Sequence, residues 1–310
     1  MAKRPRPRAS TGPSTAHRDA PASPDVTEPS EPAHKTKKLK LHASYTLQSP
    51  FPDFTHPSPG EALAVYNILL KAHSPDGVPR HRPSPSANSA ESCGDVPNVI
   101  EALIGTILSQ NTSAKNSSAA KANLDARFGR NNFSALAEAP REEVVDAIRN
   151  GGLANKKAGT IQSILRSVRE KHGEYSLQHV AQPGGDGRVL SNDEIMQELM
   201  SYDGVGPKTA SCVLLFCLGR DSFAVDTHVY RLSKLLGWVP GKADRVLAQA
   251  HLDLRIPDEL KYALHVLMIQ HGRVCKGCKK SASGDCALKM YVRQRVSQVN
   301  VNEAVKERVD

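Results

Sequence analysis

The stretch SYDGVGPKTASCVLLFCLGRDSFAVDTHVYRL, residues 201–232, decides the fold and holds most of the polar chemistry of the chain. It contains the end of one helix, a Gly204-Val205-Gly206 turn and a second helix that begins at Pro207. Glycine permits the positive φ angles of a tight turn, and proline suits the first helical position, where an N–H has no helical partner. The stretch therefore predicts two helices joined by a short hairpin.

This hairpin is a candidate binding element. Backbone N–H groups at a helix N-terminus can hold a phosphate, and such contacts grip a DNA backbone without reading its sequence. The candidate DNA-binding residues are therefore Gly204, Val205, Gly206 and, in the first helical turn, Thr209. An ordinary corner between two helices would also account for a Gly-Val-Gly turn.

Two ionisable residues flank the second helix of the hairpin. Lys208 lies in the first turn, where the positive end of the helix dipole and partial burial should both lower its pKa. A lysine of lowered pKa is a nucleophile that can form a Schiff base. Asp226, 18 residues further on, can cap the helix that starts at Thr227, and capping alone would explain it. Beside the lysine, it could also accept a proton or stabilise a cation.

The rest of the chain predicts an all-α fold. Apolar residues recur at helical spacing, and the strand candidates are too short to build a sheet. The expected helices cover residues 58–73, 97–110, 113–129, 141–150, 154–173, 192–202, 207–219, 227–237, 241–252 and 257–272. Residues 74–96 read as a flexible insertion, and residues 291–310 as a tail of uncertain fold.

The first 57 residues predict a disordered, basic tail, because residues 1–59 hold 11 of the 21 prolines and few aliphatic side chains. The formal net charge of +9 favours an anionic partner such as nucleic acid. The basic runs KRPRPR (3–8) and HKTKKLK (34–40) indicate the nucleus. A mitochondrial location is the alternative, although the early prolines disfavour a transit helix. No apolar run is long enough to span a membrane.

The GVGPKTA hairpin, the lysine-to-aspartate spacing and the following VDTHVYRL closely resemble helix–hairpin–helix DNA glycosylases of the endonuclease III type, the HhH-GPD family. Three further stretches are similar to the same family: ILSQNTSAKNSSAAKANL (107–124), GLANKKAGTI (152–161) and IQHGR (269–273). The resemblance covers roughly residues 97–273. It implies two helical lobes with a DNA-binding cleft between them.

The resemblance also implies a reaction. Such enzymes flip a base out of duplex DNA. By analogy, Lys208 would attack the sugar C1′, expel the base and form a Schiff base that permits β-elimination, while Asp226 assists. Gln110 or Asn111 would fill the gap left by the flipped base, although both could simply cap the next helix. The implied partner is double-stranded DNA that contains damaged or mismatched bases, bound by a monomer.

The last three cysteines depart from the family pattern. Many members hold an iron–sulfur cluster on four cysteines spaced x6, x2 and x5, whereas Cys275, Cys278 and Cys286 are spaced x2 and x7. A cluster of that kind needs four thiolates. We therefore expect no cofactor and no iron–sulfur cluster. A Cys3His zinc site that includes His271 is the weaker alternative, because His271 already belongs to the His-Gly-Arg of the family.

These observations predict a bifunctional DNA glycosylase and abasic-site lyase. One lobe is expected over residues 97–208 and the other over 58–73 plus 209–290, with Asp226 at the cleft. Two alternatives remain open: a non-catalytic DNA-binding protein that keeps the hairpin, and a glycosylase for mismatched thymine, adenine or methylated cytosine. The lysine disfavours the adenine type, and the presence of both Lys208 and Asp226 disfavours the non-catalytic protein.

Overall fold

A computed structural model of the chain describes residues 39–40, 43–279 and 285–306. Most of the predicted basic tail, including the run at 3–8 and nearly all of the run at 34–40, lies outside the described residues. The described part contains helices and turns but no strand, which confirms the all-α prediction. Among its helices, none is both long and apolar enough to cross a membrane.

The α-helices are α2 Pro59–His73, α3 Val99–Ser109, α4 Ala114–Phe128, α5 Phe133–Glu138, α6 Arg141–Ala147, α7 Ala154–His172, α8 Asn192–Met200, α9 Pro207–Cys212, α10 Thr227–Leu235, α11 Arg245–Arg255, α12 Asp258–Val274 and α13 Ala287–Lys306. The described residues also form shorter helical segments: the 3₁₀ helices η1 Arg149–Gly151, η2 Gln178–Val180 and η4 Lys276–Cys278, and the π-helical η3 Val213–Cys217.

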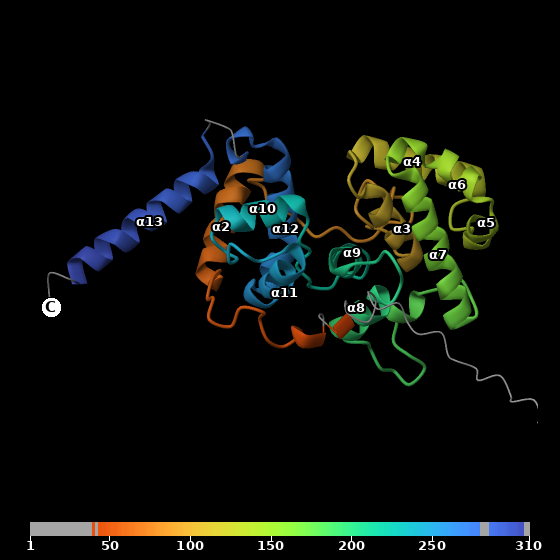
Figure 1. The fold of residues 1–310 in the computed structure, drawn as a ribbon, viewed down its shortest axis with the longest axis horizontal. Helices are drawn as coiled ribbons and strands as arrows, with labels where there is room; N and C mark the ends of the chain where they lie inside the picture. Colours follow the sequence, from red (N-terminus) through yellow and green to blue (C-terminus); the bar gives the residue numbers. More distant parts are fainter. Residues whose placement is uncertain (1–38, 41–42, 280–284, 307–310) are drawn as a thin grey trace, which may run out of the picture.

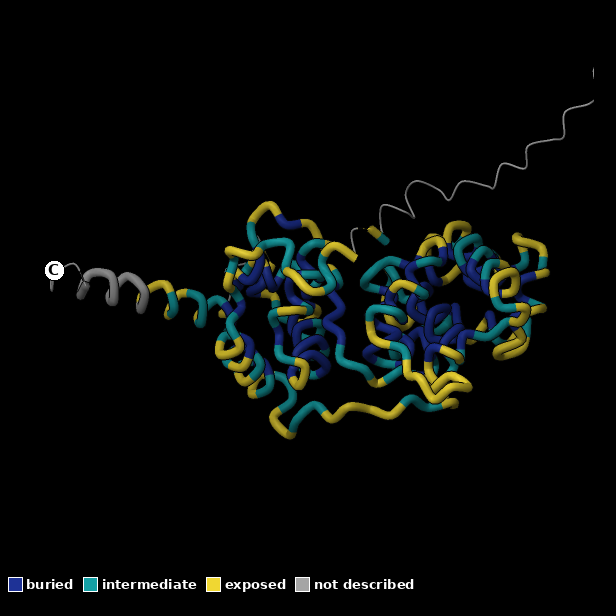
Figure 2. Tube along the Cα trace, turned by 90° about the horizontal axis from the view of Figure 1, so that it is seen from below, coloured by how far each residue is buried: buried dark blue, intermediate teal, exposed yellow. Residues whose placement is uncertain are grey.

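The helices form two lobes, each with its own buried apolar core (Figures 1 and 2). Helices α3 to α9 build the first lobe, and α2 joins α10, α11, α12 and the start of α13 in the second. Helix α2 packs on α12 although about 200 residues separate them in sequence. The first core extends through η3 to Cys217, beyond the predicted boundary at residue 208, because α9 continues into η3 without leaving that core.

Segment 74–96 has no helix, yet it contacts both lobes. The Arg80 guanidinium donates to Asp221 at 2.7 Å, and the Thr106 hydroxyl donates to the Cys93 carbonyl at 3.2 Å. Ser89 and Ala90 are buried against the first lobe, and Ser89 touches the backbone of Gly105 so closely that no side chain would fit there. The predicted flexibility of this segment stays a prediction.

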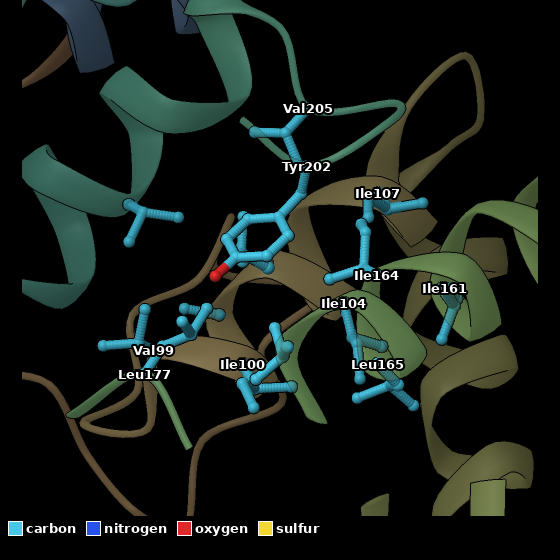
Figure 3. Close-up of a cluster of buried hydrophobic side chains, with 14 of the residues drawn as sticks. Val99, Ile100, Ile104, Ile107, Ile161, Ile164, Leu165, Leu177, Tyr202 and Val205 are labelled. Carbon is cyan, nitrogen blue, oxygen red and sulfur yellow. The ribbon is translucent and has the colours of Figure 1, made fainter. Parts of the chain in front are cut away.

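The hairpin between α8 and α9 is fixed to the first core by two side chains. Tyr202 and Val205 are fully buried, and Figure 3 shows them beside Ile107 and Ile164. The Val205 N–H donates to the Tyr202 carbonyl at 3.2 Å, which closes the turn. Because its apolar side chains anchor the hairpin, the first turn of α9 has a defined position relative to the first lobe.

Gly204 is the position in the hairpin that only glycine suits. Its φ is +83°, and a Cβ placed there would lie 2.4 Å from the Thr160 methyl group on α7. Gly204→Ala is therefore expected to lower the free energy of unfolding by roughly 1–3 kcal/mol. Denaturant titration would measure it against Gly185→Ala, a glycine with open space around its Cβ position. Equal stability of the two variants would contradict the argument.

Helix α13 covers most of the stretch whose fold the sequence left uncertain. It begins at Ala287 beside the second lobe and runs to Lys306, and Figure 1 shows it projecting away from the two lobes. Cys286 and Leu288 at its start are buried in the second core. Tyr291 and Val292 pack against the same core, and Arg295 forms an ion pair with Glu61 on α2 at 2.6 Å, so the first turns of α13 attach the helix to the second lobe.

Candidate active site

A cavity of 380 Å³ lies where the two lobes meet the hairpin. Residues of both lobes line it, so its shape depends on how the lobes pack. Its lining consists of Ser109, Gln110, Asn111, Gly204, Gly206, Pro207, Lys208, Thr209, Val225, Asp226, Thr227, Arg245, Val246 and Gln249. All the predicted catalytic and DNA-binding residues except the buried Val205 are among them.

Two helix N-termini bring Lys208 and Asp226 to this cavity. Lys208 is the second residue of α9, which follows the Gly206 cap. Asp226 caps α10, and its Oδ1 accepts a hydrogen bond from the Val229 N–H at 2.7 Å. Its second carboxylate oxygen is not used by this cap. Asp226 thus has the capping role that the sequence suggested and still presents a carboxylate to the cavity that contains Lys208.

The charge of Lys208 differs from the sequence-based expectation. Burial by itself lowers the pKa of Lys208, but Cys212, Cys93 and Asp226 together raise that pKa above its usual range. The prediction of a lowered pKa was therefore wrong, because it considered only the helix dipole and burial. Cys212 lies one turn after Lys208 on the same helix, and burial raises the pKa of its thiol to about 11. Lys208 is thus an ammonium group near neutral pH and must lose a proton before it can attack carbon.

Gln110 and Asn111, the two candidates for filling the gap left by a flipped base, lie in different surroundings. Gln110 ends α3, is half-buried, and its Nε2 donates to the Thr209 hydroxyl at 3.2 Å. Asn111 is exposed and has a φ of +51°, in the left-handed region that asparagine tolerates better than most residues. Gln110 is therefore tied to the hairpin, whereas Asn111 is an exposed part of the cavity lining.

A buried lysine fixes the loop that carries these two residues. Lys157 on α7 donates from Nζ to the Leu108 carbonyl at 2.7 Å and to the Gly151 carbonyl at 2.8 Å. Burial lowers its pKa to about 8. The sequence analysis did not single it out, because a lysine on an amphipathic helix normally faces solvent. Its two bonds satisfy carbonyls at the end of α3 and in η1.

Helix α11 supplies three lining residues that the sequence analysis missed: Arg245, Val246 and Gln249. Arg245 and Val246 are exposed, while Gln249 is buried and its Oε1 accepts from the Val225 N–H at 3.1 Å. The spacing of the three residues, i, i+1 and i+4, places them on one helix face. That spacing was visible in the sequence, but the direction in which the face points was not.

A neutral histidine lies close to Lys208 and Asp226. Burial lowers the pKa of His265 to about 4, and Asp226 and Lys208 are among the charges that act on it. Its Nδ1 lies 2.8 Å from the Ala224 carbonyl, so Nδ1 carries the proton and Nε2 a lone pair. Nε2 is buried and has no hydrogen-bond partner. The neutral imidazole therefore offers an unused hydrogen-bond acceptor in this region.

A second cluster of polar side chains lies in the second lobe. The structure brings together His271, Cys275, Cys278 and Cys286, the four weak metal candidates of the sequence analysis, with their ligand atoms within 4.8 Å of one another. Such a group could hold a metal ion. The sequence analysis expected no metal, because the spacing departs from the family pattern, and kept a Cys3His zinc site with His271 as the weaker alternative; the structure brings together the four residues of that alternative.

Comparison with known proteins agrees with this arrangement. Residues 104–257 match the model of the HhH-GPD superfamily of base excision DNA repair proteins. An Arabidopsis thaliana protein named "Putative DNA glycosylase" is 37% identical over 251 residues, which cover 76% of this chain and 83% of that protein. The chain belongs to the HhH-GPD superfamily. It is a DNA glycosylase of the endonuclease III-like kind.

Other HhH-GPD proteins support the same assignment. The endonuclease III of Thermotoga maritima is 34% identical over 175 residues, which cover 56% of this chain and 73% of that protein. The solved structure of a non-covalent endonuclease III–DNA complex matches with a TM-score of 0.55 and 26% identity, over 77% of this chain and 99% of that one. These likenesses support DNA binding by this fold.

Proposed function

We propose that this glycosylase is bifunctional: it removes a base from double-stranded DNA and then cuts the strand at the abasic site. The observation that carries the proposal is that Lys208 and Asp226 line one cavity between the lobes. A site that only binds the phosphates of DNA needs neither a nucleophile nor a carboxylate. An enzyme that forms a covalent intermediate needs both: a nucleophile to attack the substrate, and a carboxylate to accept protons and stabilise positive charge.

The hairpin and the cavity mouth would position the DNA. The backbone around Gly204 and Gly206 lines the cavity and suits contact with a phosphate. Asn111, exposed in the cavity lining, is suited to fill the space of a flipped base, while Gln110 holds the hairpin through Thr209. We propose a damaged or mismatched base as the target, a monomer as the active form and the nucleus as the location.

The chemical step begins with deprotonation of Lys208. Asp226 would accept the ammonium proton, and the free amine would then bond to the sugar C1′. The glycosidic bond between C1′ and the base nitrogen breaks, and its electron pair leaves with the base, which takes up a proton. The lysine nitrogen, now bonded to C1′, loses a proton, and its lone pair forms the C1′=N bond of the Schiff base as the C1′–O4′ bond breaks and O4′ takes up a proton. Loss of a proton from C2′ then expels the 3′ phosphate, so strand cleavage needs no water and no oxidant.

A borohydride trapping experiment tests the proposal. The full chain is incubated with a panel of duplexes, each with one damaged or mismatched base, and with a duplex that contains a preformed abasic site. Borohydride should reduce the Schiff base and leave a protein–DNA adduct on the abasic duplex and on at least one base duplex. Binding without any adduct on the whole panel would contradict bifunctional chemistry and favour the non-catalytic DNA-binding protein.

The raised pKa of Lys208 gives a pH prediction. Only the uncharged amine attacks, and its fraction grows as pH rises toward that pKa. The rate of single-turnover cleavage at a preformed abasic site should therefore rise with pH, by about tenfold per pH unit where one deprotonation is limiting. DNA binding measured at each pH is the control. A rate that falls as pH rises from mildly acidic to mildly basic would contradict this assignment.

A further inference from the structure

The cysteine and histidine cluster of the second lobe has a compact geometry. His271 is in the last turn of α12, Cys275 caps that helix, Cys278 ends η4 and Cys286 directly precedes α13. The His271 Nε2 lies 2.9 Å from the Cys278 sulfur and 3.6 Å from the Cys286 sulfur, and the two sulfurs are 3.1 Å apart. Four potential ligands thus converge on one point.

These residues do not fit the iron–sulfur cluster that the family resemblance implies. Such clusters use four cysteines, or two cysteines and two histidines in the Rieske type, and they distribute these ligands over several irons. Among the described residues, the remaining cysteines lie in the first core or beside Lys208: Cys93, Cys212 and Cys217. The donor set at α12 is three sulfurs and one imidazole around a single centre.

Three sulfurs and one imidazole form a common donor set of structural zinc sites. Tetrahedral zinc with Zn–S bonds of about 2.3 Å places its sulfur ligands about 3.8 Å apart. The 3.1 Å between the Cys278 and Cys286 sulfurs is slightly shorter, so these side chains need to spread by less than about 1 Å around an ion. Cys278, Cys286 and His271 are buried and Cys275 is half-buried, and the four ligands together would fill a tetrahedral coordination shell.

A neighbouring histidine orients the imidazole. The His73 Nε2, at the end of α2, lies 2.7 Å from the His271 Nδ1. If His271 Nδ1 carries the proton and donates it to His73, the lone pair of His271 Nε2 points at the sulfurs. Metal-binding histidines are usually held in this way by a partner on the other ring nitrogen. The pairing therefore provides a partner for the tautomer that a metal ligand requires.

The backbone around the cluster is also fixed. The Arg231 guanidinium on α10 donates to the carbonyls of Cys278 at 2.5 Å and Gly272 at 3.1 Å. Cys286 directly precedes α13, so its sulfur lies at a helix N-terminus, which favours negative charge. Arg231 adds a positive charge close to a site whose three thiolates exceed the charge of one zinc ion.

We propose that His271, Cys275, Cys278 and Cys286 hold one structural zinc ion, which fastens the start of α13 to α12 in place of the family's iron–sulfur cluster. Binding converts the thiols to thiolates and releases their protons to solvent, with no change of oxidation state. The site is independent of the proposed lyase chemistry, because it shares no residue with the cavity that Lys208 lines.

Metal analysis of the full chain, purified under reducing conditions, provides the first test. We expect about one zinc per chain and a colourless protein. Replacing zinc with Co²⁺ should give the strong visible bands of tetrahedral, thiolate-ligated cobalt. Cys278→Ser and Cys286→Ser should lose the metal. Cys217→Ser, at another buried cysteine that belongs to the first core, should keep it.

Two further variants keep the test decisive if the serine variants do not fold. His271→Cys replaces one zinc ligand with another, so this variant should retain one metal per chain and change the cobalt spectrum. His73→Phe keeps all four ligands and removes only the hydrogen bond to His271, so zinc affinity should fall by about 10–100-fold. Unchanged affinity in His73→Phe would show that His73 does not orient a ligand.

Chelation gives an independent readout. A strong chelator should lower the midpoint of thermal unfolding of the parent by several degrees, because the metal binds the folded chain. Any of three results would overturn the proposal. The first is stoichiometric iron, and the second is a Cys278–Cys286 disulfide in protein purified under reducing conditions. The third is a metal-free protein whose unfolding is unaffected by chelator and by added Zn²⁺. Activity on DNA is not part of any of these measurements.

Discussion

Lys208→Gln is expected to abolish the borohydride-trapped adduct with abasic-site DNA. Glutamine keeps much of the length of the side chain but has no amine that can form a Schiff base. The loss should be at least about 10³-fold, the scale seen when a nucleophile is removed. The measurement is the yield of covalent protein–DNA complex on a duplex with one preformed abasic site.

The matched control is Lys234→Gln. Lys234 is exposed on α10, donates to the Gly241 carbonyl and lies outside the cavity. It should trap as well as the parent. DNA affinity of Lys208→Gln should remain within a few-fold, because the hairpin backbone is unchanged. If Lys208→Gln traps as efficiently as Lys234→Gln, the nucleophile is another group and the proposed mechanism fails.

Asp226→Asn is expected to slow base removal and strand cleavage by about 10²–10⁴-fold, the usual contribution of a proton-transfer group. Asparagine is also a good N-cap, so the bond to the Val229 N–H and the start of α10 should persist. The charge near Lys208 disappears, and with it the group proposed to accept the ammonium proton. Single-turnover rates on a reactive duplex measure the effect.

Asp244→Asn makes the same chemical change at the cap of α11, where the Asp244 carboxylate accepts from the Leu247 N–H at 2.9 Å. Both variants should unfold at nearly the parent temperature, and only Asp226→Asn should react slowly. A further measurement separates charge from structure: the Lys208 pKa, read from the pH profile, should fall in Asp226→Asn because a neighbouring negative charge is lost. Parent-like rates in Asp226→Asn would remove Asp226 from the mechanism.

The local features of the hairpin and of the helix ends could be predicted because neighbouring residues encode them. Ser58 caps α2 and forms a capping box with Glu61, and the Ser-x-x-Glu pattern of residues 58–61 encodes this cap. Gly204 adopts the positive φ that its residue type permits, and Pro207 occupies the first turn of α9. Each of these features depends on contacts within about four residues, which makes it visible in a single sequence.

The charge of Lys208 shows where such local reasoning fails. Two of the groups that raise its pKa, Cys93 and Asp226, are far from it in sequence, and only the packing of segment 74–96 and α10 brings them near. The helix dipole and burial do lower the pKa of a lysine, but they are only two of the effects that together set that pKa. A pKa depends on every charge within several ångströms, so it follows from the tertiary structure.

The sequence by itself determined the all-α class, the hairpin, and the presence of a lysine and an aspartate at two helix N-termini. Only the tertiary structure placed Arg245 and Gln249 at the cavity, turned Lys157 inward to two carbonyls, and gathered His271 with three cysteines beside His73. The physical reason is the separation along the chain of the residues that determine each feature. Helix periodicity, caps and turns arise from bonds between near neighbours, whereas a cavity wall or a ligand set forms only when the apolar cores fix distant helices against one another.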